Sequence, residues 1–164
     1  MPFFADVRVD HPWLSKSILS LHKALLQNST TIEVESHFIW FLAQLVKRYA
    51  DTPVTEQKLG KENKAIQEAR RYIEDHFAHG ISLDTLSRHV ALSPYYFLRL
   101  FCAKVGMPPH TYLESVRIRH AQGLIRAGKS LAEITTEVGF SSQSHLTRCF
   151  KKIIGVTPGQ YAQD

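Results

Sequence analysis

Apolar residues in the first third of the chain recur with the period of an amphipathic α-helix. Leu14, Ile18, Leu21 and Leu25 share one face of a first segment. A second segment carries a wider apolar stripe, made of Val34, Phe38, Phe41, Leu42, Leu45, Val46 and Tyr49. The polar residues 28–31 between the two stripes favour a turn and offer an N-cap for the second helix. Residues 1–50 are therefore predicted to form an antiparallel helical hairpin.

Two helices alone cannot bury both stripes of this hairpin. The surplus apolar surface must meet a second copy of the chain, the C-terminal part of the chain, or a domain missing from this sequence. We favour a homodimer contact over packing on the C-terminal part. The dimerisation residues predicted on this basis are Leu14, Ile18, Leu21, Leu25, Phe38, Phe41 and Leu45.

Residues 51–62 interrupt the periodic pattern. This segment is polar, carries Pro53 and Gly60, and is predicted to be an interdomain linker. Helical periodicity resumes after it and reaches a predicted helix end near Gly80, a residue that suits a left-handed C-cap. Residues 63–164 contain only helical patterns and short turns, without the alternation of a strand, so the fold class expected is all-α.

The C-terminal hundred residues contain an internal repeat. Five positions return 48 residues later: Leu83, Leu86, Val90, Leu92 and Ser93 as Leu131, Ile134, Val138, Phe140 and Ser141. Six more return 49 residues later: Phe97, Arg99, Phe101, Gly106, Pro109 and Tyr112 as Leu146, Arg148, Phe150, Gly155, Pro158 and Tyr161. Each copy has a short helix, a tight turn and a second helix that ends in Arg-x-Phe. The repeat predicts two helix-turn-helix units, at about residues 83–104 and 131–153.

The residues of each unit suit this motif. The turn residue, Ala91 in one unit and Gly139 in the other, must be small where the two helices cross closely. Ser93 can N-cap the second helix of the first unit, and Ser141 or Ser142 that of the second. Buried aromatic and aliphatic residues at i, i+4 spacing would hold one face of this helix to the core, which leaves the opposite face free to enter a groove of DNA.

The outward positions of both second helices carry chemistry that can read DNA. Arginine can bind guanine through two hydrogen bonds and glutamine can bind adenine in the same way, whereas Tyr, Ser and Thr contact phosphates or pyrimidines. Arg99 and Arg148 have a structural alternative, pairing with a neighbouring carboxylate. The predicted DNA-binding residues are Tyr95, Tyr96, Leu98, Arg99, Ser142, Gln143, Ser144, His145, Thr147 and Arg148.

The net charge of +5 is distributed unevenly along the chain. Residues 1–62 hold seven Lys and Arg against seven Asp and Glu, whereas residues 63–164 hold thirteen against eight. The excess positive charge therefore lies in the part that carries the repeat, where it would favour contact with phosphates. No signal peptide or membrane-spanning segment is apparent, so we expect a cytoplasmic protein with no membrane partner.

Two longer stretches of this repeat resemble the AraC/XylS family of bacterial transcription regulators. One runs from Gly139 to Lys152 and continues as Gly155-Val156-Thr157-Pro158-Gly159-Gln160-Tyr161. The other is Leu92-Ser93-Pro94-Tyr95-Tyr96-Phe97-Leu98-Arg99-Leu100-Phe101, with Gly106 and Tyr112. The resemblance covers about residues 65–162. It implies two helix-turn-helix subdomains, joined by a long helix at about 109–127, whose recognition helices enter successive major grooves.

The resemblance also implies roles for single residues and for the hairpin. Carried over by position, the base readers are Tyr95, Leu98 and Arg99 in the first unit and Gln143, Ser144, His145 and Arg148 in the second. Leu98 departs from the polar residue expected of a base reader. The hairpin resembles the one that follows the effector barrel of full-length members and often forms their dimer contact. Because the barrel is absent, no small-molecule effector is expected on this chain.

The function expected is a sequence-specific DNA-binding transcription regulator, an activator by the commoner family behaviour, with double-stranded DNA and RNA polymerase as partners. An enzyme is the first alternative, since His145 and Cys149 lie four residues apart on one helix. No third metal ligand is near them in the sequence and no glycine-rich phosphate loop occurs, so neither catalysis, a metal nor a cofactor is expected. The second alternative is a truncated interaction module that sequesters partner regulators through its hairpin.

Overall fold

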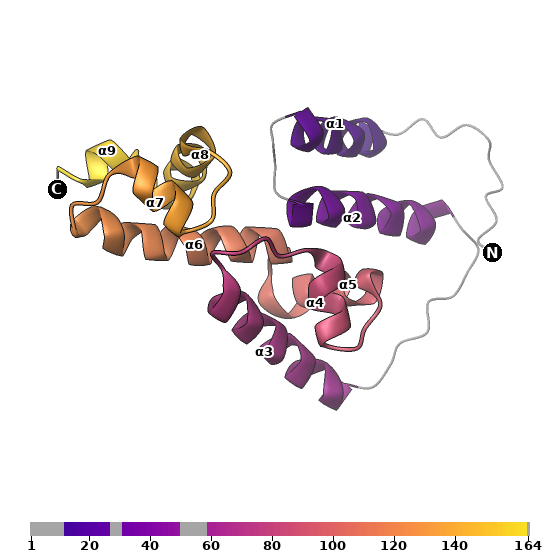
Figure 1. The fold of residues 1–164 in the computed structure, drawn as a ribbon. Coiled ribbons are helices and arrows are strands. Elements are labelled where there is room, and N and C mark those ends of the chain that lie inside the picture. The colour runs from indigo at the N-terminus through magenta and orange to yellow at the C-terminus, as the bar shows by residue number, and fades with distance from the viewer. Residues whose placement is uncertain (1–11, 27–30, 50–58, 164) are drawn as a thin grey trace.

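The computed structural model describes residues 12–26, 31–49 and 59–163, and this part of the chain is all-helical (Figure 1). The all-α prediction is therefore confirmed. None of the described helices is both long and apolar enough to cross a membrane. The helices are α1 (Pro12–Leu26), α2 (Thr31–Tyr49), α3 (Leu59–His76), α4 (Leu83–His89), α5 (Pro94–Val105), α6 (Pro109–Arg126), α7 (Leu131–Glu137), α8 (Gln143–Ile154) and α9 (Pro158–Tyr161).

The first helix-turn-helix unit consists of α4 and α5, close to the predicted boundaries. Ser82 and Ser93 cap these helices, since their hydroxyls accept hydrogen bonds from the backbone N–H groups of Thr85 and Tyr96. Pro94 occupies the first turn of α5, where a missing N–H leaves no helical bond unmade.

The second unit consists of α7 and α8. Ser130 and Glu133 form a capping box at the start of α7. Of the two serines offered by the sequence for α8, Ser142 is the N-cap and accepts a hydrogen bond from the backbone N–H of His145. The caps thus place the start of each second helix where the repeat predicted it.

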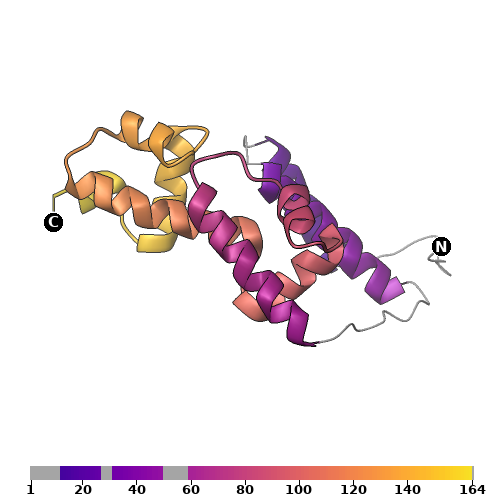
Figure 2. The ribbon, with the colours of Figure 1, turned by 60° about the horizontal axis from the view of Figure 1, so that its bottom comes forward.

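The long helix α6 forms the axis between the two units and belongs to two hydrophobic cores. Its first half contributes Leu113 and Val116 to the core of the first unit, and its second half contributes Ile118 and Ala121 to the core of the second. Phe77, just after α3, packs against both cores. Figure 2 shows the second unit at one end of α6, with α3 and the hairpin at the other end.

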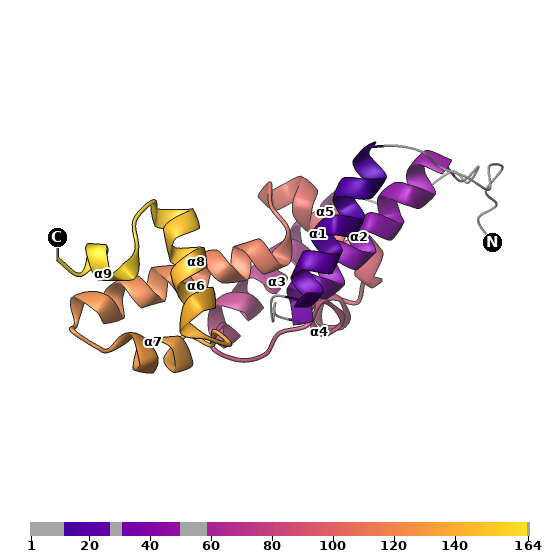
Figure 3. The same cartoon turned by 90° about the horizontal axis from the view of Figure 1, so that it is seen from above.

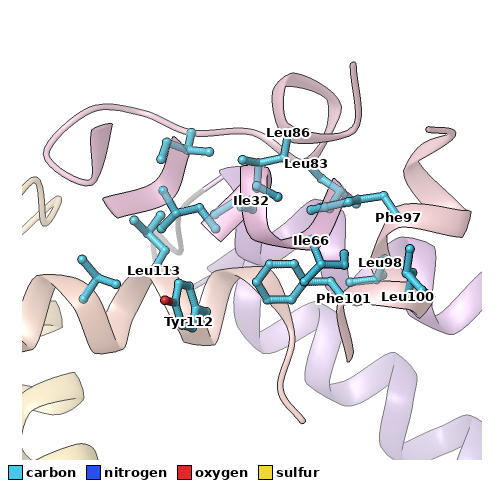
Figure 4. Packing of buried hydrophobic residues seen from close by; sticks show 14 residues of the cluster. Ile32, Ile66, Leu83, Leu86, Phe97, Leu98, Leu100, Phe101, Tyr112 and Leu113 are labelled. Atoms are coloured by element: carbon cyan, nitrogen blue, oxygen red, sulfur yellow. The ribbon is translucent and has the colours of Figure 1, made fainter. Parts of the chain in front are cut away.

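The hairpin packs on the C-terminal part of the chain. Helices α1 and α2 lie side by side, and α2 also contacts α4, α5 and α6. Ile32 of α2 is fully buried among the residues of the first unit, where it lies near Leu83 and Leu86 (Figure 4). The carboxylate of Glu35 accepts a hydrogen bond of 2.6 Å from the backbone N–H of Leu83 at the start of α4. One face of α2 is therefore covered by the C-terminal part of the chain, which was the less favoured of the two expectations for the hairpin.

Two local expectations are corrected by the structure. Helix α3 begins at Leu59, inside the segment predicted as a linker, and residues 50–58 lie outside the described part. Gly80 is not among the glycines with positive φ, and α3 already ends at His76, so Gly80 does not form a left-handed cap. The sequence predicts a C-cap there because glycine follows the last apolar position, but three residues separate Gly80 from the end of α3.

The turn between the two helices of each unit passes through a left-handed residue. Gly139 has φ 79° and Ala91, the equivalent residue, has φ 53°. A Cβ at Gly139 would lie 2.3 Å from the backbone oxygen of Ala78, which belongs to the segment after α3. Glycine is thus required at 139 both for its backbone conformation and for the close approach of the two units.

We predict opposite effects of exchanging the two turn residues. Gly139→Ala should lower the free energy of unfolding by at least about 2 kcal/mol, because a left-handed alanine is strained and its Cβ meets the carbonyl of Ala78. Ala91→Gly relieves the same strain and should be neutral or stabilising by up to about 1 kcal/mol. Urea denaturation followed by circular dichroism measures both. Equal effects of the two exchanges would contradict this account.

Candidate nucleic-acid interface

Helix α8 presents a polar face to solvent and buries the opposite face. Leu146 and Phe150 are fully buried in the core of the second unit. Four of the predicted DNA-binding residues are exposed around the start and middle of the helix: Ser142, Gln143, Ser144 and Arg148. Thr147 is half-buried. Lys151 and Lys152 are exposed in the last turn and add positive charge. This face combines hydrogen-bonding side chains with the charge that phosphates attract.

His145 does not belong to this polar face, which corrects its predicted role as a base reader. Its side chain is only 3% exposed and lies edge-on against the ring of Phe140, with ring centroids 5.1 Å apart. The imidazole Nε2 is 3.6 Å from Oε1 of Glu114 on α6. Position 145 faces inward because α8 crosses α6 there, a contact that the sequence of α8 does not reveal.

The first unit presents a less open and less polar face. Tyr95, Tyr96 and Arg99 are all half-buried. The Arg99 guanidinium lies over the Tyr96 ring, 5.6 Å from its centroid, and the Tyr96 hydroxyl donates a hydrogen bond to the carboxylate of Glu62 on α3. These contacts hold the tyrosine and the arginine in place beside the start of α5.

Leu98 is buried, and its predicted place among the base readers is also corrected. It is 1% exposed and belongs to the core of the first unit. Leu98 lines a cavity of about 450 Å³ between α5 and α2, together with Ser36, His37, Trp40 and Cys102. An apolar residue on an outward stripe of α5 is thus explained by α2, which packs against that stripe.

The hairpin and α8 lie on the same side of α6, as Figure 3 shows. Helix α3 lies on the other side of α6 from α8 (Figure 1). The hairpin therefore stands beside α5 on the side from which α8 projects. In this arrangement the second unit is open and the first is partly covered.

Two buried charged residues of α6 escaped the sequence analysis. Arg117, only 3% exposed, donates hydrogen bonds from Nε to the carbonyl of Phe77 at 2.8 Å and from Nη2 to that of His79 at 3.0 Å. Burial lowers the pKa of Arg117 to about 10, so it stays protonated at neutral pH. Glu114, one turn earlier, contacts α8. The burial of Glu114 and Arg117 could have been expected from their position beside the apolar residues Leu113, Val116 and Ile118, in a helix buried on several faces.

Comparison with known proteins agrees with this geometry. A family model described as a helix-turn-helix domain matches residues 86–164. A structure from Chromobacterium violaceum, titled a transcriptional regulator with an AraC-type DNA-binding domain, aligns over 64% of this chain and 95% of its own with a TM-score of 0.58 and 24% identity, which shows the shared fold. The C-terminal part of the chain therefore has the fold of an AraC-type DNA-binding domain.

Two further proteins are similar to this chain, one in structure and one in sequence. The DNA-binding domain of AdpA, solved with a target DNA, is 25% identical, has a TM-score of 0.57 and covers 60% of this chain and 90% of its own. YbfI of Bacillus subtilis, described as an uncharacterized HTH-type transcriptional regulator, is 29% identical over 146 residues, which are 89% of this chain and 53% of YbfI. The chain spans about half the length of the curated relatives it matches.

The burial of Leu98 predicts that its truncation destabilises the first helix-turn-helix unit. Leu98→Ala should lower the free energy of unfolding by about 2 to 5 kcal/mol, as is typical for a fully buried leucine. Ser144→Ala, at an exposed position of α8, is the control and should change it by no more than about 0.5 kcal/mol. Thermal and urea denaturation measure both. If the Leu98→Ala protein were as stable as the Ser144→Ala control, the burial of Leu98 would be contradicted.

Proposed function

We propose that this protein is a sequence-specific DNA-binding transcription regulator that reads DNA chiefly with α8. The observation that carries the proposal is the two-sided character of this helix. Its inner face is fixed by Leu146 and Phe150, while Gln143, Ser144 and Arg148 are exposed on the other face. A rigid helix with this polar face suits direct contact with base edges in a major groove.

Phosphate contacts would supply the sequence-independent part of the affinity. Lys151 and Lys152 at the end of α8 are exposed and basic. Ser142 and Thr147 flank the readers and have hydroxyls that can bind phosphate oxygens. The binding of AdpA to its target DNA, on a domain that resembles this one, supports the same use of the fold.

The first unit would contribute through Tyr95, Tyr96 and Arg99. These side chains are half-buried and α2 lies against the neighbouring stripe of α5. We therefore propose that α8 provides most of the sequence discrimination, and that α5 adds contacts to the extent that α2 leaves its face accessible. When the face of α5 is accessible, both helices would enter successive major grooves.

Arginine substitutions test the unequal roles of the two helices. After selection of a preferred site from random oligonucleotides, Arg148→Ala should weaken binding by about 1 to 3 kcal/mol and relax specificity at one base pair. Arg99→Ala should have a smaller effect on specificity. Arg71→Ala on α3, across α6 from α8, is the matched control and should leave the affinity unchanged apart from a small general effect of charge.

Mobility-shift titrations at several salt concentrations provide the measurement. An equal loss for Arg148→Ala on preferred and random DNA would make Arg148 a phosphate anchor instead of a base reader. No salt-dependent binding by the unmodified chain would overturn the proposed function and favour the interaction module. Transcriptional activation and contact with RNA polymerase rest on the family resemblance alone, and a reporter gene with the selected site upstream would test them.

We also propose that the uncovered face of the hairpin joins two copies of the chain. Of the eight large hydrophobic residues that are exposed in the described structure, seven lie on α1 and α2: Ile18, Leu19, Leu25, Leu26, Phe38, Trp40 and Leu42. Three of these, Ile18, Leu25 and Phe38, were predicted as dimerisation residues. The other four predicted dimerisation residues, Leu14, Leu21, Phe41 and Leu45, are half-buried. A concentrated apolar face of this kind fits an isologous contact.

Leu25→Glu tests the dimer. Leu25 is 60% exposed, so a charge there should leave the fold intact and shift the sedimenting species from dimer to monomer. Phe41 is a poorer probe, because its ring stacks on that of Trp13 within the hairpin, with centroids 6.1 Å apart. Ser20→Glu, at an exposed polar position of α1, is the control for added charge. A monomeric unmodified chain at micromolar concentration would refute this contact.

A further inference from the structure

Helices α6 and α8 bring together a buried cluster of three side chains that no part of the proposed function uses. Glu114 comes from α6, whereas His145 and Cys149 lie one turn apart on α8. The carboxylate, imidazole and thiol are all buried, and one potential ligand atom of each lies within 4.8 Å of the others. The third ligand that is missing from the sequence around His145 and Cys149 is thus supplied by another helix.

One nitrogen of this cluster lacks a hydrogen-bond partner. His145 Nε2 is buried and 3.6 Å from Glu114 Oε1, which is too long for a hydrogen bond. The other ring nitrogen, Nδ1, faces the Ser141 hydroxyl at 3.4 Å. A buried polar atom without a hydrogen-bond partner lowers the stability of the fold, so a ligand bound at Nε2 would remove this cost.

The remaining contacts account for the cluster only in part. The Cys149 thiol donates a hydrogen bond of 3.3 Å to Glu114 Oε1. Burial would raise the pKa of Glu114, but His145 and Cys149 more than offset it, and the pKa lies below its ordinary value. Glu114 is therefore a carboxylate at neutral pH. This arrangement satisfies the thiol and the carboxylate but leaves His145 Nε2 without a hydrogen-bond partner.

We propose that Glu114, His145 and Cys149 bind a divalent transition-metal ion, zinc before others. The donor set of one thiolate, one imidazole and one carboxylate is typical of zinc. The two negative ligands would balance both charges of the ion, which a buried site requires. The Ser141 hydroxyl beside Nδ1 would orient the imidazole, as outer partners of metal-binding histidines do.

A fourth ligand position remains for water. His110, one turn before Glu114 on α6, is not part of the cluster. Its ring lies against that of His37, with centroids 5.0 Å apart, and lines the cavity between α5 and α2.

Two positive residues near the cluster direct their charges elsewhere. Arg117 directs its guanidinium to the carbonyls of Phe77 and His79, and Lys152 is exposed at the surface. Burial and Glu114 raise the pKa of the Cys149 thiol, which is protonated in the metal-free protein. Metal binding would therefore replace the S–H bond with a sulfur–metal bond and release one proton to solvent.

Cobalt and zinc ions alone provide the test on the full chain. After treatment with a chelator, one equivalent of Co²⁺ should produce a near-ultraviolet thiolate-to-metal absorption band, which added Zn²⁺ removes. Cys149→Ser should abolish the band. Cys102→Ser is the matched control, because Cys102 is the other free cysteine and lies outside the cluster, so this variant should keep the band. Zn²⁺ at about a hundred times its Kd should raise the unfolding midpoint by about 5 to 10 °C.

Glu114→Gln provides a second variant if Cys149→Ser folds poorly, which circular dichroism would show. It removes the charge but keeps the shape of the side chain, and it should weaken Zn²⁺ binding at least about tenfold. The absence of a thiolate band in the unmodified chain would overturn the proposal. So would an equal response of the Cys149→Ser protein, since the exposed histidines, such as His76 and His120, would then be binding the ion adventitiously. None of these readouts depends on DNA.

Discussion

The end of α3 is held against the middle of α6 by a buried guanidinium, and both helix-turn-helix units depend on this joint. Arg117 donates hydrogen bonds to the carbonyls of Phe77 and His79, two residues that follow the end of α3. The same short segment brings the Ala78 carbonyl against Gly139 in the turn of the second unit. Breaking the joint would leave a charge and two carbonyls unpaired, so the geometry between the units is strongly determined.

The joint explains why one helix can serve two cores. Helix α6 contributes Leu113 and Val116 on one side of Arg117 and Ile118 and Ala121 on the other. Phe77 packs against both groups and stacks on His120, with ring centroids 3.9 Å apart. The second helix of each unit is then fixed relative to α6. A chain that reads an extended DNA site needs this kind of rigid spacing between its two reading helices.

Much of the fold could be predicted from the sequence because its signals are local. The serine caps, the apolar periodicity and the duplicated turn fixed the helices of both units to within a few residues, and the polar face of α8 followed from spacing alone. Leu98 and His145 could not be placed in this way. Each lies on an outward position of its own unit, and each is buried by a helix distant in sequence, α2 for Leu98 and α6 for His145. Glu114 could not be recognised as a candidate metal ligand for the same reason, because it lies on α6 whereas His145 and Cys149 lie on α8.

The contact of Leu98 with α2 makes the hairpin and the first reading helix thermodynamically linked. Burying a leucine contributes about 1.5 to 3 kcal/mol, and separating α2 from α5 would return that side chain to water. A ligand that engages the full face of α5 must offset this cost, and anything that draws α2 away lowers it in advance. By reciprocity, occupancy of α5 loosens the hairpin to the same degree. A single apolar side chain would thus let events at the N-terminal helices alter the strength of the DNA binding proposed for α5.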